Sequence, residues 1–137
     1  MTTARAEPTK AKVLVVDDEA DFTATYERLL RRQGFGVVSA SSRRAGLAAI
    51  AAEPLDLVIA DLRLPDGDGL DLVRAARKTA TPTPVIVITG FASEASRQAS
   101  LAAGASAYLP KPFSASTFAA LVEKTVRASQ GRPEPPR

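Results

Sequence analysis

The stretch LDLVIADLRLPDGDG, residues 55–69, decides the fold. Residues 57–60 are apolar at consecutive positions, which is typical of a strand that is buried on both faces of a parallel sheet. The run ends on one carboxylate, Asp61, and a proline and two glycines then turn the chain directly into a helix. Because open α/β sheets bind ligands at the carboxyl ends of their strands, Asp61 is a candidate functional residue. A turn-capping role is the alternative, since Asp is common in turns.

The composition narrows the chemistry that the chain can perform. A length of 137 residues suits one domain, and 45% hydrophobic residues with only 5% aromatics predict an aliphatic core. The chain has no cysteine, which excludes disulfides, thiolate metal sites and cysteine nucleophiles. It has no histidine either, so the commonest general base and the commonest transition-metal ligand are absent. Any bound metal is therefore expected to be a hard cation held by oxygen atoms.

Charge and hydropathy indicate whether the protein binds nucleic acid or a membrane, and in which compartment it is expected. The net charge is +3, and most of it lies in the two terminal segments, so the central body is nearly neutral. A neutral body argues against a nucleic-acid surface on this domain. No apolar run approaches the length of a membrane span, and residues 1–12 lack the apolar centre of a signal peptide. We therefore expect a soluble, cytoplasmic protein with no membrane contact.

Five short apolar runs alternate with five amphipathic segments along the chain. The predicted strands cover residues 12–16, 35–40, 57–61, 84–89 and 107–109. The predicted helices cover residues 20–33, the segment from Ser41 or Ser42 to Pro54, and residues 69–78, 93–104 and 114–129. This alternation predicts an α/β fold, a (βα)5 doubly wound, five-stranded parallel sheet with helices on both faces. The predicted domain spans residues 12–129, with a flexible lead-in at 1–11 and a flexible tail or linker at 130–137.

Polar side chains follow the predicted strands at the edge where their carboxyl ends meet. This edge collects Asp17 and Asp18, then Asp61, then Thr89 and Lys111. Three carboxylates in one pocket repel one another, and a bound Mg²⁺ would relieve that repulsion. The Thr89 hydroxyl and the Lys111 ammonium add donors for an anion. The pattern therefore predicts a site for a phosphoryl group on Asp61.

Four motifs carry a resemblance to a known family. They are VLVVDDE at 13–19, DLRLPDGDGL at 61–70, VIVITG at 85–90 and YLPKPF at 108–113. Through these motifs the chain resembles the receiver domain of two-component response regulators, which has a flavodoxin-like fold and includes the chemotaxis receiver. The resemblance covers about residues 11–129 and implies the strand order 2-1-3-4-5.

The resemblance implies a role for each residue of the polar edge. Asp61 would accept a phosphoryl group from a sensor histidine kinase or a histidine phosphotransfer protein. Mg²⁺ would be bound by Asp18, Asp61 and the main-chain carbonyl of Arg63, with Asp17 acting mainly through a water molecule. Lys111 would pair with the phosphoryl oxygens, or with Asp61 before phosphorylation.

The resemblance also implies a switch. The Thr89 hydroxyl would move inward to bond a phosphoryl oxygen, and Tyr108 would rotate inward behind it. The Lys111–Pro112 peptide bond would be cis. Phosphorylation would then change the surface formed by the fourth helix, the fifth strand and the fifth helix. Such a protein assists only its own phosphorylation and dephosphorylation and is not an enzyme in the usual sense.

Two further positions are expected to set the lifetime of the phosphorylated state. In the family, the side chains two residues after the acceptor and two residues after the switch threonine border the path of water. These positions are Arg63 and Phe91 here. Neither side chain is a carboxylate or an amide that could orient a water molecule, so slow self-dephosphorylation is expected.

Several alternatives remain open at this point. The chain could be the receiver of a longer regulator, such as a transcription activator or a hybrid kinase. An aspartyl-phosphate hydrolase of the haloacid dehalogenase type is less favoured, because such enzymes carry D-x-D on the first strand and need a cap over the substrate. Flavin binding is disfavoured because the acidic run 17–19 would repel the flavin phosphate. The predicted output surface carries few charges, which favours a monomer or a weak, phosphorylation-dependent dimer.

Overall fold

The computed structural model describes residues 11–129. The main sheet consists of β1 (Lys12–Val16), β2 (Gly36–Ala40), β3 (Leu57–Asp61), β6 (Val85–Thr89) and β7 (Ala107–Pro110). The helices of this region are α1 (Ala20–Arg32), α2 (Arg43–Ala52), α3 (Leu70–Arg77), α4 (Glu94–Ala103) and α5 (Ala115–Ser129). The predicted tail at 130–137, and all of the predicted lead-in except Ala11, lie outside the described residues.

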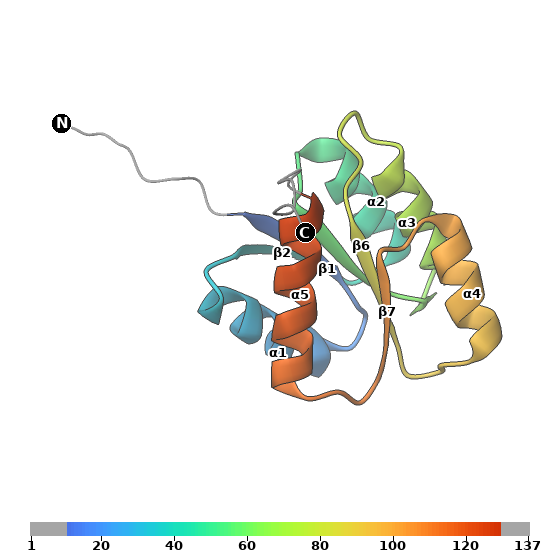
Figure 1. The fold of residues 1–137 in the computed structure, drawn as a ribbon. Coiled ribbons are helices and arrows are strands. Elements are labelled where there is room, and N and C mark those ends of the chain that lie inside the picture. The colour runs from blue at the N-terminus through green and yellow to red at the C-terminus, as the bar shows by residue number, and fades with distance from the viewer. Residues whose placement is uncertain (1–10, 130–137) are drawn as a thin grey trace, which may run out of the picture.

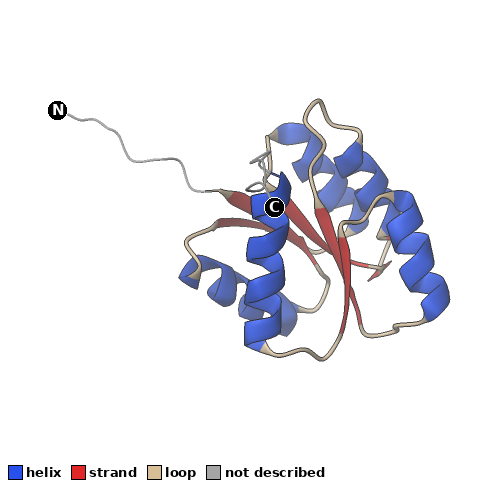
Figure 2. Ribbon diagram, viewed as in Figure 1, coloured by secondary structure: helices blue, strands red, loops and turns tan. Residues whose placement is uncertain are grey.

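The main sheet is parallel throughout, and its strand order is β2-β1-β3-β6-β7. In order of appearance this is 2-1-3-4-5, so the predicted (βα)5 fold is confirmed. Figure 2 shows the strands in the middle of the molecule with helices on either side. The register pairs Val16 with Ala60, Asp61 with Ile88, and Thr89 with Pro110. The carboxyl ends of β1, β3, β6 and β7 therefore lie at one edge.

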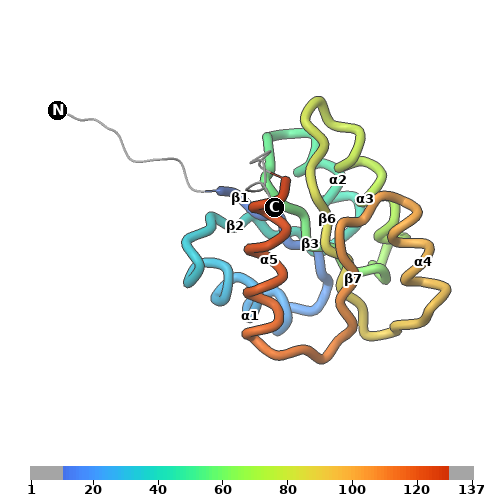
Figure 3. The backbone as a smooth tube through the Cα atoms, in the orientation of Figure 1, coloured from blue at the N-terminus to red at the C-terminus, as the bar shows by residue number. Residues whose placement is uncertain are grey.

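The side chains of each strand alternate between two separate cores. Val13 and Val15 of β1 pack in a cluster with α1 and α5, whereas Leu14 and Val16 pack in a second cluster with α2 and α3. Figures 1 and 3 show α1 and α5 on one side of the sheet and α2, α3 and α4 on the other. Because successive side chains of a strand point to opposite faces, an uninterrupted apolar run is needed to fill both cores.

The turn after β3 contains a short hairpin that the sequence analysis did not predict. Its strands are β4 (Arg63–Leu64) and β5 (Gly67–Asp68), which pair in antiparallel fashion. Gly67 has a φ of +151°, a backbone conformation that residues with a Cβ rarely adopt. The glycine thus permits the tight reversal between the two strands.

Side-chain caps fix the starts of two helices. The Ser42 hydroxyl accepts a hydrogen bond from the Ala45 amide at the start of α2, which decides between the two predicted caps. At the start of α4, Ser93 and Ser96 form a reciprocal capping box. None of the described helices has both the length and the apolar character needed to cross a bilayer.

Candidate functional site

Four strands place polar side chains at the same edge of the sheet, where their carboxyl ends meet. Asp17 follows β1, Asp61 ends β3, Thr89 ends β6, and Lys111 follows β7. Asp17 and Asp61 are buried, with 2% and 7% of their surfaces exposed, and Thr89 is fully buried. Buried carboxylates are rare unless they are paired, so this arrangement requires a partner for the negative charge.

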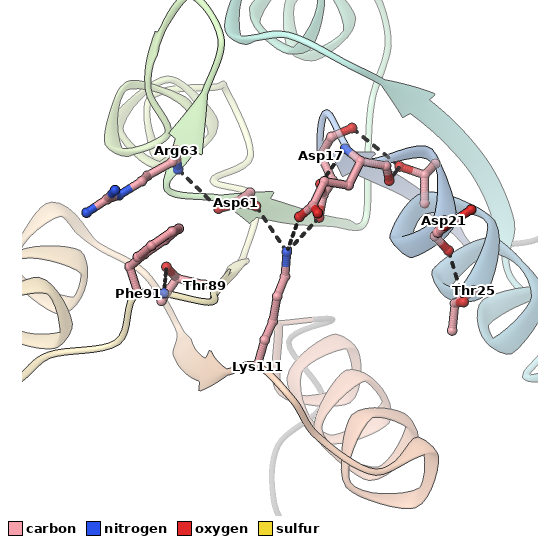
Figure 4. Close-up of polar contacts among 10 residues, drawn as sticks. Asp17, Asp21, Thr25, Asp61, Arg63, Thr89, Phe91 and Lys111 are labelled. Atoms are coloured by element: carbon pink, nitrogen blue, oxygen red, sulfur yellow. Dashed lines mark hydrogen bonds and ion pairs between the residues drawn. The ribbon is translucent and has the colours of Figure 1, made fainter.

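The Lys111 ammonium supplies positive charge to this group of carboxylates. Its ammonium nitrogen lies 3.1 Å from Asp61 Oδ2, 3.2 Å from Asp17 Oδ2 and 3.5 Å from a carboxylate oxygen of Glu19. Only 7% of the lysine side chain is exposed. Figure 4 shows Lys111 extending between Asp61 and Asp17, so a single cation contacts carboxylates from both strand ends.

The carboxylates gathered here are not quite the predicted set. Oxygen atoms of Asp17, Glu19 and Asp61 lie within 4.8 Å of one another. Asp18 is exposed and lines the same pocket, which has a volume of about 590 Å³, but its carboxylate does not belong to this group. The Glu19 amide donates a 2.9 Å hydrogen bond to Asp17 Oδ1. The acidic run at 17–19 was the only sequence signal for Glu19.

Burial and neighbouring charges shift the pKa values of Asp17 and Lys111. Burial raises the pKa of Asp17 above its usual value, and the charge of Asp61 adds to the increase; the Glu19 amide and Lys111 oppose it without cancelling it. Burial lowers the pKa of Lys111, but the charges and hydrogen bonds of Asp17 and Asp61 outweigh burial, so the pKa is raised. Lys111 therefore stays charged, and one ammonium faces three carboxylates. This oxygen-rich set with excess negative charge fits a hard divalent cation such as Mg²⁺.

The backbone after Asp61 is held close to the carboxylate of this residue. The Arg63 amide donates a 3.1 Å hydrogen bond to Asp61 Oδ1, and the Gly69 amide donates to the Leu62 carbonyl at 2.9 Å. A Cβ at Gly69 would lie only 2.0 Å from the carbonyl oxygen of Asp61. A residue without a side chain is therefore required for α3 to begin directly against the end of β3.

Thr89 and Tyr108 form hydrogen bonds outside the carboxylate cluster. The Thr89 hydroxyl accepts a 3.0 Å hydrogen bond from the Phe91 amide. The half-buried Tyr108 directs its hydroxyl to the start of α4, where it accepts from the Ser93 amide at 3.2 Å and bonds the Ser96 hydroxyl. The two predicted switch residues thus lie on neighbouring strands, and each is bonded to the β6–α4 connection.

The two predicted lifetime residues contact each other. The guanidinium carbon of Arg63 lies 3.8 Å from the centroid of the Phe91 ring, which is a cation–π geometry. Figure 4 shows the Arg63 side chain directed away from Asp61 and towards Phe91. Both residues line the pocket that contains Asp61, and Phe91 is 62% exposed. The Lys111–Pro112 peptide bond is cis.

Comparison with known proteins identifies the class. Residues 13–123 match the family described as the response regulator receiver domain, and the chain therefore belongs to this family of two-component signalling proteins. A probable transcriptional regulatory protein of Picosynechococcus sp. is 38% identical over 129 residues, covering 89% of this chain. The matched region is 51% of that protein, so the chain spans about half the length of this curated relative.

Solved structures of receivers have the same fold. A CheY-like receiver domain protein from Methanospirillum hungatei JF-1 superposes with a TM-score of 0.84 at 30% identity, covering 89% of this chain and 98% of the other. The chemotaxis response regulator CheY4 of Vibrio cholerae superposes with a TM-score of 0.79 at 30% identity, covering 85% and 99%. The flavodoxin-like receiver fold is thereby shown.

Proposed function

We propose that this chain is a phosphorylatable switch whose acceptor is Asp61 and whose donor is a sensor histidine kinase or a histidine phosphotransfer protein. The observation that carries the proposal is the grouping of Asp17, Glu19 and Asp61 around the ammonium of Lys111. A purely structural role gains nothing from three crowded carboxylates, because each makes the charged form of the others less favourable.

The reaction needs only a carboxylate oxygen and charge stabilisation. An oxygen of Asp61 forms a bond to phosphorus while the bond from phosphorus to the donor histidine nitrogen breaks, and that nitrogen then takes up a proton. Lys111 is 3.1 Å from Asp61 and can transfer its contact to the phosphoryl oxygens. Thr89, at the end of the neighbouring strand, can offer its hydroxyl to another phosphoryl oxygen.

We expect Mg²⁺ to be held by Asp18, Asp61 and the main-chain carbonyl of Arg63, with Asp17 acting mainly through a water molecule. Bound Mg²⁺ supplies positive charge that offsets the charge of the phosphoryl oxygens. The fit is supported by the carboxylate oxygens gathered at this site, which carry more negative charge than Lys111 neutralises.

Phosphorylation of Asp61 would change the conformations of Thr89 and Tyr108, and through them the surface of the domain. A Thr89 hydroxyl that turns to the phosphoryl group gives up its bond to the Phe91 amide. A Tyr108 ring that rotates inward gives up its bonds to Ser93 and Ser96 at the start of α4. Phosphorylation would thus shift the population between two arrangements of the surface formed by α4, β7 and α5.

The stack of Arg63 on Phe91 supports a long-lived phosphorylated state. Both side chains border the pocket of Asp61, and neither can act as a base towards a water molecule. We therefore propose slow self-dephosphorylation, suited to a persistent signal or to removal by a partner phosphatase.

We further propose the extent of the domain and the setting in which it acts. We take residues 12–129 as the receiver unit, acting in the cytoplasm as a monomer or a weak, phosphorylation-dependent dimer, without binding nucleic acid or membrane itself. The relative of about twice the length supports an alternative in which this receiver belongs to a longer regulator.

Incubation with Mg²⁺ and acetyl phosphate tests the proposal. The expected result, by intact mass spectrometry, is one phosphoryl group per chain, lost in Asp61→Asn and kept in the matched control Asp66→Asn. Asp66 lies in the adjacent turn and binds the amides of Arg43 and Arg44 instead of the pocket. Release of phosphate from diverse esters without a stable adduct would support the hydrolase alternative instead.

A further inference from the structure

The ammonium of Lys111 also contacts an aromatic ring. Its nitrogen lies 4.0 Å from the centroid of the Phe22 ring, within the range of a cation–π interaction. Phe22 is a half-buried residue of the first turn of α1 and lines the same pocket as Asp61 and Lys111. The pattern of the sequence places Phe22 on the buried face of α1 but gives no sign of this contact.

We propose that Phe22 is a positioning residue for Lys111, and that the face of its ring holds the ammonium at the phosphoryl site. This inference rests on the proposed phosphorylation of Asp61. It assigns to Phe22 a contact that persists when the carboxylates change partners.

The flexible side chain of Lys111 requires neighbours that hold its ammonium in place. Its four-carbon stem is flexible and its ammonium is a point charge without a preferred plane, so its position depends on its neighbours. Asp17 and Asp61 hold it while they are free of other cations, but a divalent cation would compete for the same oxygens. Glu19, whose side chain is 57% exposed, would then draw the ammonium towards solvent. An uncharged ring does not exchange partners in this way.

The position of the ring is fixed from both sides of the site. Phe22 stacks on Tyr26 of α1 with 6.1 Å between centroids, and Tyr26 stacks on Phe118 of α5 at 5.4 Å. Phe113, two residues after Lys111, stacks on Tyr26 at 6.0 Å and on Phe118 at 5.5 Å. One aromatic cluster therefore joins α1 to the connection that carries the lysine, which sets the distance between Phe22 and Lys111.

Replacing Phe22 by mono-, di- and trifluorinated phenylalanine tests the inference. Fluorine removes negative charge from the ring face and leaves the shape almost unchanged. Affinity for beryllofluoride in the presence of Mg²⁺ should fall stepwise, by about three- to tenfold in total. Phe22→Leu should lose at least as much, whereas Phe22→Tyr should retain affinity. Trifluorinated phenylalanine at Phe35, a half-buried residue outside this aromatic cluster and outside the pocket, is the matched control and should leave affinity unchanged.

A second measurement uses the protein without Mg²⁺ or beryllofluoride. The ε-methylene protons of Lys111 should show an upfield ring-current shift in nuclear magnetic resonance spectra, and Phe22→Leu should abolish it. Absence of that shift, or equal affinity across the fluorinated series, would overturn the role of Phe22 while leaving Asp61 phosphorylation intact. Failure of the unsubstituted protein to bind beryllofluoride would instead overturn the proposed function itself.

Discussion

Replacing Gly69 by alanine tests how closely α3 approaches the end of β3. The new Cβ would lie 2.0 Å from the Asp61 carbonyl oxygen and 3.0 Å from both the Asp61 carbonyl carbon and the Leu62 Cα. All three obstacles are main-chain atoms, so no side-chain rotation relieves the contact. Either α3 or the end of β3 must move by about 1 Å, because ordinary carbon–oxygen contacts lie beyond 3 Å.

Two opposing effects determine the change in unfolding free energy of Gly69→Ala. Overpacking of a well-packed site costs about 1–3 kcal/mol, and a contact with rigid backbone belongs at the upper end. Gly69 has φ −65° and ψ −15°, which alanine adopts without strain. Alanine also lowers the conformational entropy of the unfolded chain, which stabilises the folded protein by about 0.4–1 kcal/mol. The expected net loss of unfolding free energy is about 2 kcal/mol, which corresponds to a Tm lower by about 8 °C for a domain of this size.

Urea unfolding and differential scanning calorimetry measure this loss, with Gly36→Ala as the control. A Cβ at Gly36 meets nothing closer than the Ala11 carbonyl oxygen at 3.9 Å, so its stability should be unchanged or slightly higher. Gly69→Ala should also weaken beryllofluoride binding, because the displaced backbone carries Asp61. A Tm for Gly69→Ala equal to that of Gly36→Ala would refute the reasoning.

Four further substitutions give independent predictions. Tyr26→Phe should leave the unfolding free energy unchanged or raise it in urea titrations, because the buried hydroxyl has no hydrogen-bond partner among the described residues and such a group costs about 1–3 kcal/mol; a clear loss would contradict this. The hydrogen bond from Arg43 holds the pKa of Asp71 below 3.8, so the stability difference between the unsubstituted protein and Asp71→Asn should be present above pH 3.8. The same difference, measured by urea unfolding, should disappear as the pH falls through the folded pKa. Phe91→Glu should shorten the phosphoryl lifetime by about tenfold or more, because a carboxylate there can act as a general base towards water; phosphate release from the isolated domain measures it. Lys111→Met leaves three carboxylates without their ammonium, so Mg²⁺ should raise its Tm more than it raises that of the unsubstituted protein, and equal increases would argue against the shared site.

Local patterns predicted most of the fold. The apolar runs identified all five strands of the main sheet to within one residue at each end. The pattern is clearest for β3 and β6, because these strands are buried along their whole length and are apolar up to their last residue. Ser93 and Gly104 marked the ends of α4 because both act through local backbone chemistry. The hairpin β4–β5 was missed because the two-residue strands are too short to show any periodicity.

The parts of the site that were missed depend on contacts between distant segments. The sequence places Glu19 beside two aspartates, but only the fold shows that its carboxylate turns to Asp61 and that of Asp18 does not. The contact of Lys111 with Phe22 joins residues 89 positions apart, and no periodicity encodes it. Similarly, the 2.7 Å ion pair between Arg43 of α2 and Asp71 of α3 joins two helices, and the pattern of neither helix indicates it.

The capping box of α4 has a consequence for the resting protein. The hydroxyl of Tyr108 shares Ser93 and Ser96 with the first turn of the helix, so the outward ring and an ordered helix start belong to one equilibrium. If Tyr108 rotates inward on phosphorylation, as proposed above, the strength of this helix cap would set the threshold that an incoming signal must exceed. Sequence changes at Ser96, which does not belong to the carboxylate cluster, would then adjust background output and leave the phosphorylation chemistry unchanged.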